Sequence, residues 1–452
     1  MNSATDSATP SQVTIARLNA RGFGVVANPP GEIGRLHLAG ALPGEEIQFH
    51  LRAKRSGARW GLVENVITPS PHRVQPKCPH APGNLPCGPG ASVCGGCAMQ
   101  HIDYAEQLRI KQERVAALFA AKSLTVNSWA DPLASDPFGY RHQARIGVRW
   151  VAKKGRLLAG FRESLSNRIT DCTRCEVLIP SVGRTLDKLT QCLAGLSIAD
   201  QIAQVEVVSG DEHAALIVRH LTPLPHQDAA RLADFGREHS LGVYTQSGGP
   251  HSIAPLLLPD GFTLDYTLDG LRIGFAPGDF IQNNLKLNRT MVAQAIDWLA
   301  PQTHERIIDL FCGIGNFSLP LARRCKALAG VEGSEQSVAR GGDNAKRNAI
   351  TNASFHAADL SNRLALEQQA PDWWREDYAA ALLDPPRSGA GALTGWLCDH
   401  VRSRLLYVSC NPESLVKDIV GLAGSYRLVR AGIIDMFPHT AHCEVMCLLE
   451  KR

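Results

Sequence analysis

Short apolar runs that stop abruptly at turn-forming residues recur along the C-terminal part of the chain. The clearest is residues 405–408, a β-branched and aromatic run that is followed by Ser-Cys-Asn-Pro. Runs of this length between turn signals predict buried parallel strands. Similar runs end near residues 311, 332 and 383, and a final strand is expected at 445–449. The pattern predicts an α/β domain with a Rossmann-like sheet over residues 266–452.

The N-terminal region has a different pattern, in which short apolar runs alternate with turn pairs. The breaks fall at residues 22–26, 28–31 and 42–45. Short strands at such spacing predict a small β-barrel, which we place at residues 12–73. Residues 1–11 are expected to form a disordered tail.

The segment between these regions, residues 74–265, mixes both periodicities. Residues 104–122 carry apolar side chains at helical spacing and are expected to form a helix, a candidate to pack on the C-terminal domain. Residues 139–148 alternate into a strand whose aromatic and basic side chains suit either RNA contact or a solvated face. Further strand-like runs lie at 205–208 and 215–218. We predict one central α+β domain.

The charge of the chain is small but unevenly distributed. The net charge is +4 over 452 residues, with 44% hydrophobic residues, which is ordinary for a globular protein. The excess of basic over acidic residues within the predicted barrel equals that of the whole chain; its basic residues are Arg17, Arg21, Arg35, Arg52, Lys54, Arg55, Arg59 and Arg73. Cations beside Trp60 suit phosphate contact and base stacking, although a solvated loop fits the same composition.

The first residues and the cysteine usage bear on the location of the protein. Residues 1–12 lack the apolar core of a signal peptide, and no apolar run is long enough to span a membrane. The 13 cysteines are an odd number, and several lie inside apolar runs. This is unlike the disulfide framework of a secreted protein and predicts a reducing, cytoplasmic location.

Several cysteines have the spacing of ligands to a common centre. Cys94 and Cys97 flank two glycines that let the backbone wrap around such a centre. The further candidates are Cys78, Cys87, Cys172 and Cys175. A tight C-x2-C pair with more cysteines on each side indicates an iron–sulfur or metal site, with four-cysteine zinc as the structural alternative. The spacing alone does not separate iron–sulfur from zinc, and a disulfide pair is the less favoured interpretation.

Acidic residues follow successive predicted strands of the C-terminal domain. Glu332, Asp359 and Asp384 occupy these ends, and a glycine turn at residues 313–315 follows the first strand. Glycines allow close approach of a ligand, and the missing third glycine argues against a dinucleotide site. A carboxylate after the second strand suits ribose hydroxyls, and acids at successive ends are typical of an S-adenosylmethionine (SAM) methyltransferase. A helix N-cap explains any one acid equally well, but not all of them together.

Cys410 and Glu444 are candidates for catalysis. Cys410 directly follows a predicted strand, at the edge where open α/β sheets bind ligands, so its thiol suits a nucleophile. A buried packing cysteine is the alternative. A loop that contains His439 and His442 presents Glu444 just before the last strand, and an acid or histidine there suits a general base. A structural hydrogen bond is the alternative for either histidine.

Four motifs occur in the order seen in the bacterial RNA uracil-C5 (m5U) methyltransferase family. They are Asp-Leu-Phe-Cys-Gly-Ile-Gly-Asn-Phe, Leu-Asp-Pro-Pro-Arg-Ser-Gly, Val-Ser-Cys-Asn-Pro and Asp-Met-Phe-Pro-His-Thr-Ala-His-Cys-Glu. The chain resembles this family over nearly its whole length. It is most similar to the 23S rRNA branch with a TRAM domain and a [4Fe–4S] cluster. Residues 41–45 and 69–74 resemble TRAM, an RNA-binding barrel.

The resemblance implies specific roles. Cys410 would be the nucleophile and Glu444 the base. The implied cofactor contacts are Gln282, Phe311, Asn316, Glu332, Asp359 and Asp384. The implied cluster ligands are Cys78, Cys94, Cys97 and Cys175. The insert between the first two ligands is longer than in the family, so Cys87 is an alternative to Cys78 as the first ligand. Cys172 is likewise an alternative to Cys175 as the fourth ligand.

The resemblance also implies partners. We expect SAM, a [4Fe–4S] cluster and RNA, foremost 23S rRNA, with no DNA or membrane partner and a monomeric protein. The alternatives are a tRNA m5U methyltransferase and a non-catalytic RNA-binding assembly factor. A radical-forming cluster is not expected, because no compact C-x3-C-x2-C is present.

Overall fold

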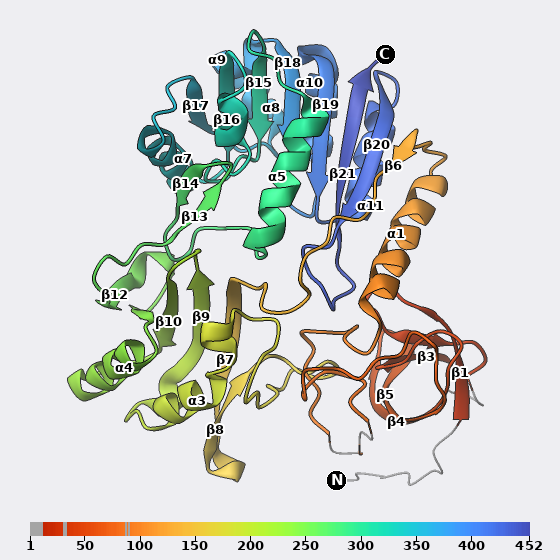
Figure 1. The fold of residues 1–452 in the computed structure, drawn as a ribbon, viewed down its shortest axis with the longest axis vertical. Coiled ribbons are helices and arrows are strands. Elements are labelled where there is room, and N and C mark those ends of the chain that lie inside the picture. The colour runs from red at the N-terminus through yellow and green to blue at the C-terminus, as the bar shows by residue number, and fades with distance from the viewer. Residues whose placement is uncertain (1–11, 30–33, 86–87, 89–90) are drawn as a thin grey trace.

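The structure is a computed structural model that describes residues 12–29, 34–85, 88 and 91–452. The tail expected to be disordered (1–11) and Cys87 lie outside the described residues. The chain builds a barrel, a central sheet and a C-terminal sheet, and Figure 1 shows the C-terminal sheet above the other two. Among the described residues, no helix is long and apolar enough to cross a membrane.

The N-terminal region is a closed five-stranded barrel in the order β1-β2-β3-β5-β4, which confirms the predicted barrel. Its strands are β1 (Gln12–Leu18), β2 (Gly24–Val26), β3 (Arg35–Ala39), β4 (Glu46–Arg55) and β5 (Ala58–Thr68). Alternating side chains such as Ile15, Leu36, Leu38 and Ile47 fill the interior and are almost fully buried. The period-2 pattern of the sequence therefore decides which face of each strand points inward.

A buried ion pair joins the two segments that resemble TRAM. Glu45 is fully buried, and its two carboxylate oxygens accept hydrogen bonds from Arg73 Nε and Nη2, each at 2.6 Å. The backbone N–H groups of Leu42 and Ser70 also donate to Glu45. Arg73 Nη2 donates further to the carbonyl of Gly40 at 2.7 Å. The pair ties the chain that leaves the barrel to the turn before β4.

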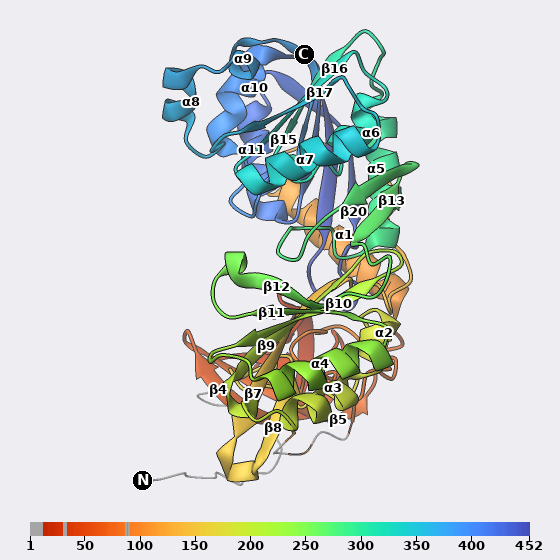
Figure 2. The same cartoon turned by 90° about the vertical axis from the view of Figure 1, so that its left-hand side faces the viewer.

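The central sheet has the order β12-β11-β10-β9-β7-β8. Its strands are β7 (Gln143–Val151), β8 (Arg156–Gly160), β9 (Ile202–Ser209), β10 (Ala214–His220), β11 (Gly242–Gln246) and β12 (Ile253–Leu257). Helices α3 (Leu186–Ala194) and α4 (His226–Glu238) pack on it, side by side in Figure 2, and α2 (Pro180–Gly183) precedes them. The strands predicted at 205–208 and 215–218 are β9 and β10.

The C-terminal sheet has eight strands in the order β17-β16-β15-β18-β19-β21-β20-β6. They are β15 (Arg306–Leu310), β16 (Ala327–Glu332), β17 (Ala353–Ala357), β18 (Tyr378–Leu383), β19 (Val401–Ser409), β20 (Tyr426–Ile434), β21 (Glu444–Lys451) and β6 (Ser128–Trp129). β15 to β19 are parallel and β21 is antiparallel to both of its neighbours. The predicted α/β fold is confirmed. The hairpin of β13 (Asp265–Leu268) and β14 (Leu271–Gly274) precedes the sheet.

Helices cover both faces of this sheet. One face packs on α5 (Leu285–Leu299), α6 (Ser318–Ala322) and α7 (Glu335–Arg347). The other packs on α8 (Arg363–Gln369), α9 (Asp372–Arg375), α10 (Thr394–His400) and α11 (Pro412–Leu422). Because neighbouring residues of β15 enter opposite cores, Ile307 one and Ile308 the other, the strands are apolar throughout instead of alternating.

The segment after the cysteine pair crosses to the C-terminal sheet. The helix predicted at 104–122 is α1 (Tyr104–Ala120), and Val115 and Phe119 enter the core beneath α11 and β20. The Asp103 carboxylate caps its first turn by accepting from the N–H groups of Ala105 and Glu106. β6 then pairs with β20 and forms the edge of the sheet. α1 therefore lies between the barrel and the C-terminal sheet (Figure 1).

Replacing Arg73 by methionine should destabilise the barrel, because it leaves the Glu45 carboxylate buried without its counter-charge. We expect the free energy of unfolding of the barrel to fall by about 3–5 kcal/mol. Hydrogen–deuterium exchange of β1 to β5 in increasing urea measures this loss. The matched control is Arg17→Met, which removes an exposed cation of the barrel and should change stability by less than about 0.5 kcal/mol. Equal exchange in the two variants would contradict the role of the ion pair.

Candidate active site

Cys410 and Glu444 face each other because β19 and β21 are antiparallel. Ser409, the last residue of β19, pairs with Val445 near the start of β21. Cys410 follows Ser409 and Glu444 precedes Val445, so these two residues lie opposite each other. Both line one cavity of about 500 Å³, within the usual range of small-molecule sites. Cys410 is half-buried and Glu444 is 5% exposed. The structure thus brings together the two residues expected to carry the chemistry.

The cavity walls come from all three parts of the chain. The barrel supplies Ala20, Arg21 and Phe23, the C-x2-C turn supplies Gly95, Gly96 and Ala98, and the central region supplies Arg141 and Ser164. The C-terminal domain adds Asn283, Arg387, Cys410, Phe437 and residues 440–444. Within the described part of the chain, two buried polar atoms here lack a hydrogen-bond partner, Asn283 Oδ1 and Glu444 Oε2. Unpartnered buried oxygens suit a polar ligand.

Burial and mutual repulsion raise the pKa values of the carboxyl groups at the site. Burial raises the pKa of Asp384, and burial together with the nearby Asp384 raises the pKa of Glu444. Burial also raises the pKa of Asp309 to about 8, with Asp384 and Glu332 adding to the effect and Ser318 opposing it. Ser318 Oγ donates to Asp309 Oδ2 at 2.5 Å. The carboxyls share one region of low dielectric, in which separate negative charges repel strongly.

The surroundings of Cys410 raise the pKa of its thiol. Burial raises its pKa above the ordinary value, and the negative charges of Glu444 and Asp384 raise it further. Arg387 lowers it, since a guanidinium favours the thiolate. Arg387 lines the same cavity. The reactivity of the thiol therefore depends on the balance between two carboxyls and one arginine.

The turn after β15 has the conformation of a ligand-binding loop. Phe311 has φ +65°, and it is followed by Gly313 at φ +54° and Gly315 at φ +96°. A Cβ on Gly315 would lie 3.0 Å from Leu319 Cγ, so the close packing of loop and helix needs glycine there. Glu332 Oε2 accepts from the N–H of Gly313 at 3.2 Å. The turn and the end of β16 are thus fixed to each other.

The expected cofactor residues fall into two groups. Gln282, Phe311, Glu332 and Asp384 gather at the carboxyl edge of the sheet, where Leu310 pairs with both Val331 and Leu383. Gln282 is buried and its Nε2 donates to Asp384 Oδ2 at 3.4 Å. A carboxyl-rich edge beside a glycine turn fits a cationic nucleoside such as SAM.

The other two expected cofactor residues have internal partners. Asn316 exchanges hydrogen bonds with Asn288 and accepts from the Tyr266 hydroxyl at 2.9 Å. Asp359 is exposed and accepts from the N–H and hydroxyl of Ser361. Ser361 lowers the pKa of Asp359, so this carboxylate is ionised. In this structure Asn316 therefore stabilises a side-chain network, and Asp359 stabilises the turn at Ser361.

Five cysteines line a second cavity, which borders the first. They are Cys78, Cys94, Cys97, Cys172 and Cys175. Gly96 and Arg141 line both cavities. Burial is the main cause that raises the pKa of Cys78, Cys97 and Cys175, whereas for Cys94 the neighbouring Cys172 thiol is the largest cause. Within the described ranges, no group of three or more Cys, His, Asp or Glu side chains is already placed to hold a metal ion.

The chemistry of this second cavity nevertheless suits a sulfur-ligated centre. The N–H of Gly96 donates to Cys94 Sγ at 3.4 Å, and backbone N–H groups near Leu178 and Val177 stabilise the Cys175 thiolate. Backbone hydrogen bonds to sulfur are typical of iron–sulfur ligation. The candidates Cys172 and Cys175 both reach the cavity, so the alternative between them stays open, and Cys87 lies outside the described residues.

Sequence reasoning missed several residues of the site. Arg387 appears in the sequence only as part of a motif, and Asp309, the penultimate residue of β15 before the glycine turn, was not predicted. Arg141 was a candidate for RNA contact, and the structure places it in the wall between the two cavities. The acid-at-strand-end signal would have found Asp309. No local signal identifies Arg387.

Comparison with known proteins gives consistent results. The tRNA (uracil-5-)-methyltransferase family model matches residues 270–452. The chain is 42% identical to the 23S rRNA (uracil(1939)-C(5))-methyltransferase of Alkalilimnicola ehrlichii, covering 98% of this chain and 97% of that protein. It is 43% identical to the protein of the same name from Hahella chejuensis, covering 92% of each.

A solved structure has the same fold. The tRNA (uracil-54, C5)-methyltransferase of Pyrococcus abyssi, in complex with S-adenosyl-L-homocysteine, superposes with a TM-score of 0.73 at 21% identity. The match covers 97% of this chain and 100% of that one.

The charges around Cys410 should control the rate at which it is alkylated. Glu444→Gln removes a negative charge and should lower the pKa of Cys410, so more thiolate is present at a given pH. At alkaline pH, where Glu444 is ionised, we expect iodoacetamide to modify Cys410 about threefold faster or more, and Arg387→Met to slow it by a similar factor. Mass spectrometry of the peptide containing Cys410 measures both rates. A slower reaction in Glu444→Gln would contradict this electrostatic assignment.

Proposed function

Because the chain belongs to the family of RNA uracil-C5 methyltransferases, we propose that it methylates C5 of a uridine in 23S rRNA, with SAM as the methyl donor. The observation that carries this proposal is the meeting of a thiol and a carboxyl, Cys410 and Glu444, across two antiparallel strands in one cavity. A reaction that passes through a covalent Cys–uracil adduct needs one nucleophile and one base on the same bound base.

Cys410 provides the nucleophile. Uracil C5 is a poor nucleophile by itself. Attack of the Cys410 thiolate on C6 forms an S–C6 bond and moves the C5=C6 electron pair into an enolate, which makes C5 electron-rich. The rigid end of β19 fixes the position of the thiol, and Arg387 favours its ionised form. SAM, when bound, supplies the methyl group that C5 accepts.

Glu444 completes the cycle. Its carboxylate takes the C5 proton, the C5=C6 bond re-forms, and the S–C6 bond breaks to release Cys410 as a thiolate. The raised pKa of Glu444 makes it a stronger base than an exposed carboxylate, provided that it is ionised when the proton leaves. Asn283 Oδ1, a buried oxygen without a partner among the described residues, lines the cavity and would accept a hydrogen bond from the imide N–H of the uracil. Asp384, which accepts from Gln282, would orient the base or the donor.

The residues that would hold SAM lie beside this cavity. Gln282, Phe311, Glu332 and Asp384 gather at the sheet edge, and the carboxylates there suit a sulfonium cation. Asn316 and Asp359 would contribute once the donor displaces or extends their present contacts with Asn288 and Ser361, respectively.

The adjoining cysteines would hold a [4Fe–4S] cluster. We assign Cys78, Cys94, Cys97 and Cys175 as its ligands, and the cluster would fix the Gly95-Gly96 turn that forms part of the cavity wall. Such a cluster would connect the central domain to the active site and so stabilise the position of one relative to the other. Nothing in the proposed methylation consumes an electron, so no redox step is needed.

The substrate is RNA whose target base can leave its stack. A uridine inside a helix cannot reach both Cys410 and Glu444 in a cavity, so the base must flip out. Arg21 of the barrel lines the cavity and lies over the rings of Phe23 and Trp60, 5.5 Å from each centroid. Its guanidinium suits a backbone phosphate, as expected of a TRAM module. The two bacterial relatives favour 23S rRNA over tRNA. The intact pair of thiol and base favours an enzyme over a non-catalytic assembly factor.

Replacing each of the two residues should stop the reaction at a different point. Cys410→Ala should abolish methylation of an unmodified 23S rRNA fragment, with a loss of turnover of at least about 10³-fold. Glu444→Gln should still form the covalent bond and transfer the methyl group, and so accumulate an RNA–protein adduct. Denaturing gels with radiolabelled SAM measure both outcomes.

Two further arms make that experiment decisive. A fragment with 5-fluorouridine should trap the unaltered protein, because fluorine cannot leave as a proton, and should not trap Cys410→Ala. A parallel tRNA transcript tests the substrate class. Normal turnover by Cys410→Ala would refute the mechanism, and preferred methylation of tRNA would overturn the rRNA assignment.

The cluster assignment has a separate, spectroscopic test. Protein purified without oxygen should contain iron and sulfide in equal amounts and absorb visible light. The Cys97→Ser variant should lose the iron, the sulfide and the visible absorbance, whereas Cys172→Ser should retain all three. Zinc in place of iron, or loss of the absorbance in Cys172→Ser but not in Cys175→Ser, would contradict the assigned ligands.

A further inference from the structure

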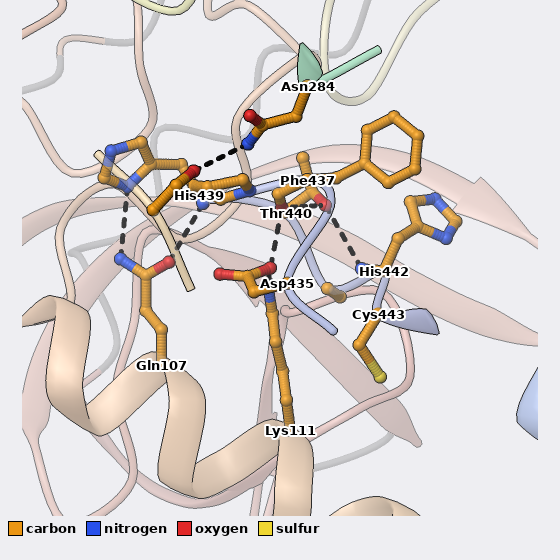
Figure 3. Close-up of polar contacts among 12 residues, drawn as sticks. Gln107, Lys111, Asn284, Asp435, Phe437, His439, Thr440, His442 and Cys443 are labelled. Atoms are coloured by element: carbon orange, nitrogen blue, oxygen red, sulfur yellow. Dashed lines mark hydrogen bonds and ion pairs between the residues drawn. The ribbon is translucent and has the colours of Figure 1, made fainter. Parts of the chain in front are cut away.

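The loop between β20 and β21, residues 435–443, ends directly at Glu444 and is clamped by one face of α1. The face consists of Gln107, Lys111 and Arg114, which recur at helical intervals and so point the same way. Figure 3 shows Gln107 and Lys111 rising from the helix toward this loop. Segments that are far apart in the sequence thus meet next to the proposed base.

Gln107 holds the loop through both ends of its amide. Its Oε1 accepts from the N–H of His439 at 3.0 Å, and its Nε2 lies 3.1 Å from His439 Nδ1. Burial lowers the pKa of His439 to about 3, so the ring is neutral and Nδ1 accepts from the amide. Gln107 also donates to the carbonyl of Ile102 at 2.8 Å, which fixes its orientation.

His439 is where the loop needs support. Its φ is +66°, a left-handed conformation that is unfavourable for a residue with a side chain. Such strain persists only where the surroundings over-determine it, and it is typical of functional sites. Besides Gln107, the N–H of Met99 donates to the His439 carbonyl at 2.9 Å, and the Tyr140 hydroxyl donates to Pro438 at 3.0 Å.

Lys111 and Arg114 fix the two ends of the loop. Lys111 is 1% exposed, and its Nζ lies 2.6 Å from Asp435 Oδ1 and 3.3 Å from the carbonyl of Phe437. Arg114 Nη2 donates to the carbonyl of Ala441 at 2.7 Å and lies 3.5 Å from Cys443 Sγ. A buried ion pair is seldom more stabilising than an apolar pair of the same volume, but it constrains geometry more strongly.

We propose that Gln107, Lys111 and Arg114 are positioning residues that hold loop 435–443 and thereby set the carboxylate of Glu444 opposite Cys410. The inference rests on the proposed role of Glu444 as base. Cys410 follows β19 and does not depend on the loop, so formation of the covalent bond should not need this face. Proton removal from C5 should need it, because a displacement of about 1 Å can cost about a hundredfold in rate.

The test separates the two halves of the reaction in single-turnover experiments with the 23S rRNA fragment. Gln107→Leu removes the clamp on His439 at nearly constant volume. We expect adduct formation to stay close to that of the unaltered protein, and release of methylated RNA to slow by about ten- to hundredfold, so that adduct accumulates. The matched control is Gln112→Leu, a partly exposed glutamine of the same helix that should leave both rates unchanged.

A second variant guards against a folding defect. Lys111→Met alone would leave Asp435 buried and uncompensated, so it is combined with Asp435→Leu, which removes both charges. This double variant should also slow release selectively. Equal slowing of adduct formation and release, weaker RNA binding as the main effect, or unchanged release in both variants would overturn the inference.

The Glu444→Gln protein distinguishes the two possible failures. If it accumulates adduct and Gln107→Leu does not, the positioning role is wrong and the proposed function stands. If Glu444→Gln itself forms no adduct, the proposed role of Glu444 fails, and the positioning role fails with it.

Discussion

The antiparallel pairing of β19 with β21 is the constraint on which the site depends. In a purely parallel sheet only residues that follow strands reach the carboxyl edge. Because β21 runs the opposite way, its first residue, Glu444, lies at that same edge, across from Cys410. Hydrogen bonds of the strand ladder thus set the separation of the proposed nucleophile and the proposed base. β18 is parallel to β19, so Asp384, which follows β18, lies at the same edge of the sheet.

The site also requires that distant parts of the chain dock on this edge. The barrel, the C-x2-C turn and the central region each contribute to the cavity, yet none of them belongs to the sheet that carries Cys410. α1 makes the connection, because its apolar face enters the core of the C-terminal domain and its polar face reaches the loop before Glu444. Arg114 additionally donates to the carbonyl of Ala20 in the barrel at 3.3 Å. Assembly of the cavity and placement of the base therefore share one helix.

Local patterns predicted the strands, the barrel, α1 and the position of Cys410 at a strand end, because each depends on periodicity and turn chemistry. Contacts between distant segments escaped prediction. A lysine in a helix is expected at the surface, yet Lys111 is buried against Asp435, which lies 324 positions further along the chain. Likewise nothing near Asn316 in the sequence reveals that Asn288 satisfies its amide. Spacing identified the candidate cysteines as a group, but which of them face one cavity depends on the tertiary fold.

The electrostatics of the cavity suit a polyanion better than its acids suggest. Arg21, Arg141 and Arg387 line it, whereas burial raises the pKa of Asp384 and of Glu444. A raised pKa lowers the ionised fraction of each carboxyl, so these two acids would repel an approaching phosphate less than exposed carboxylates would. The same burial would strengthen Glu444 in its proposed role as base, since a carboxylate with a raised pKa binds a proton more tightly. One physical cause, the burial of these two carboxyls, therefore suits both of the roles proposed for this edge, binding of a polyanion and removal of a proton.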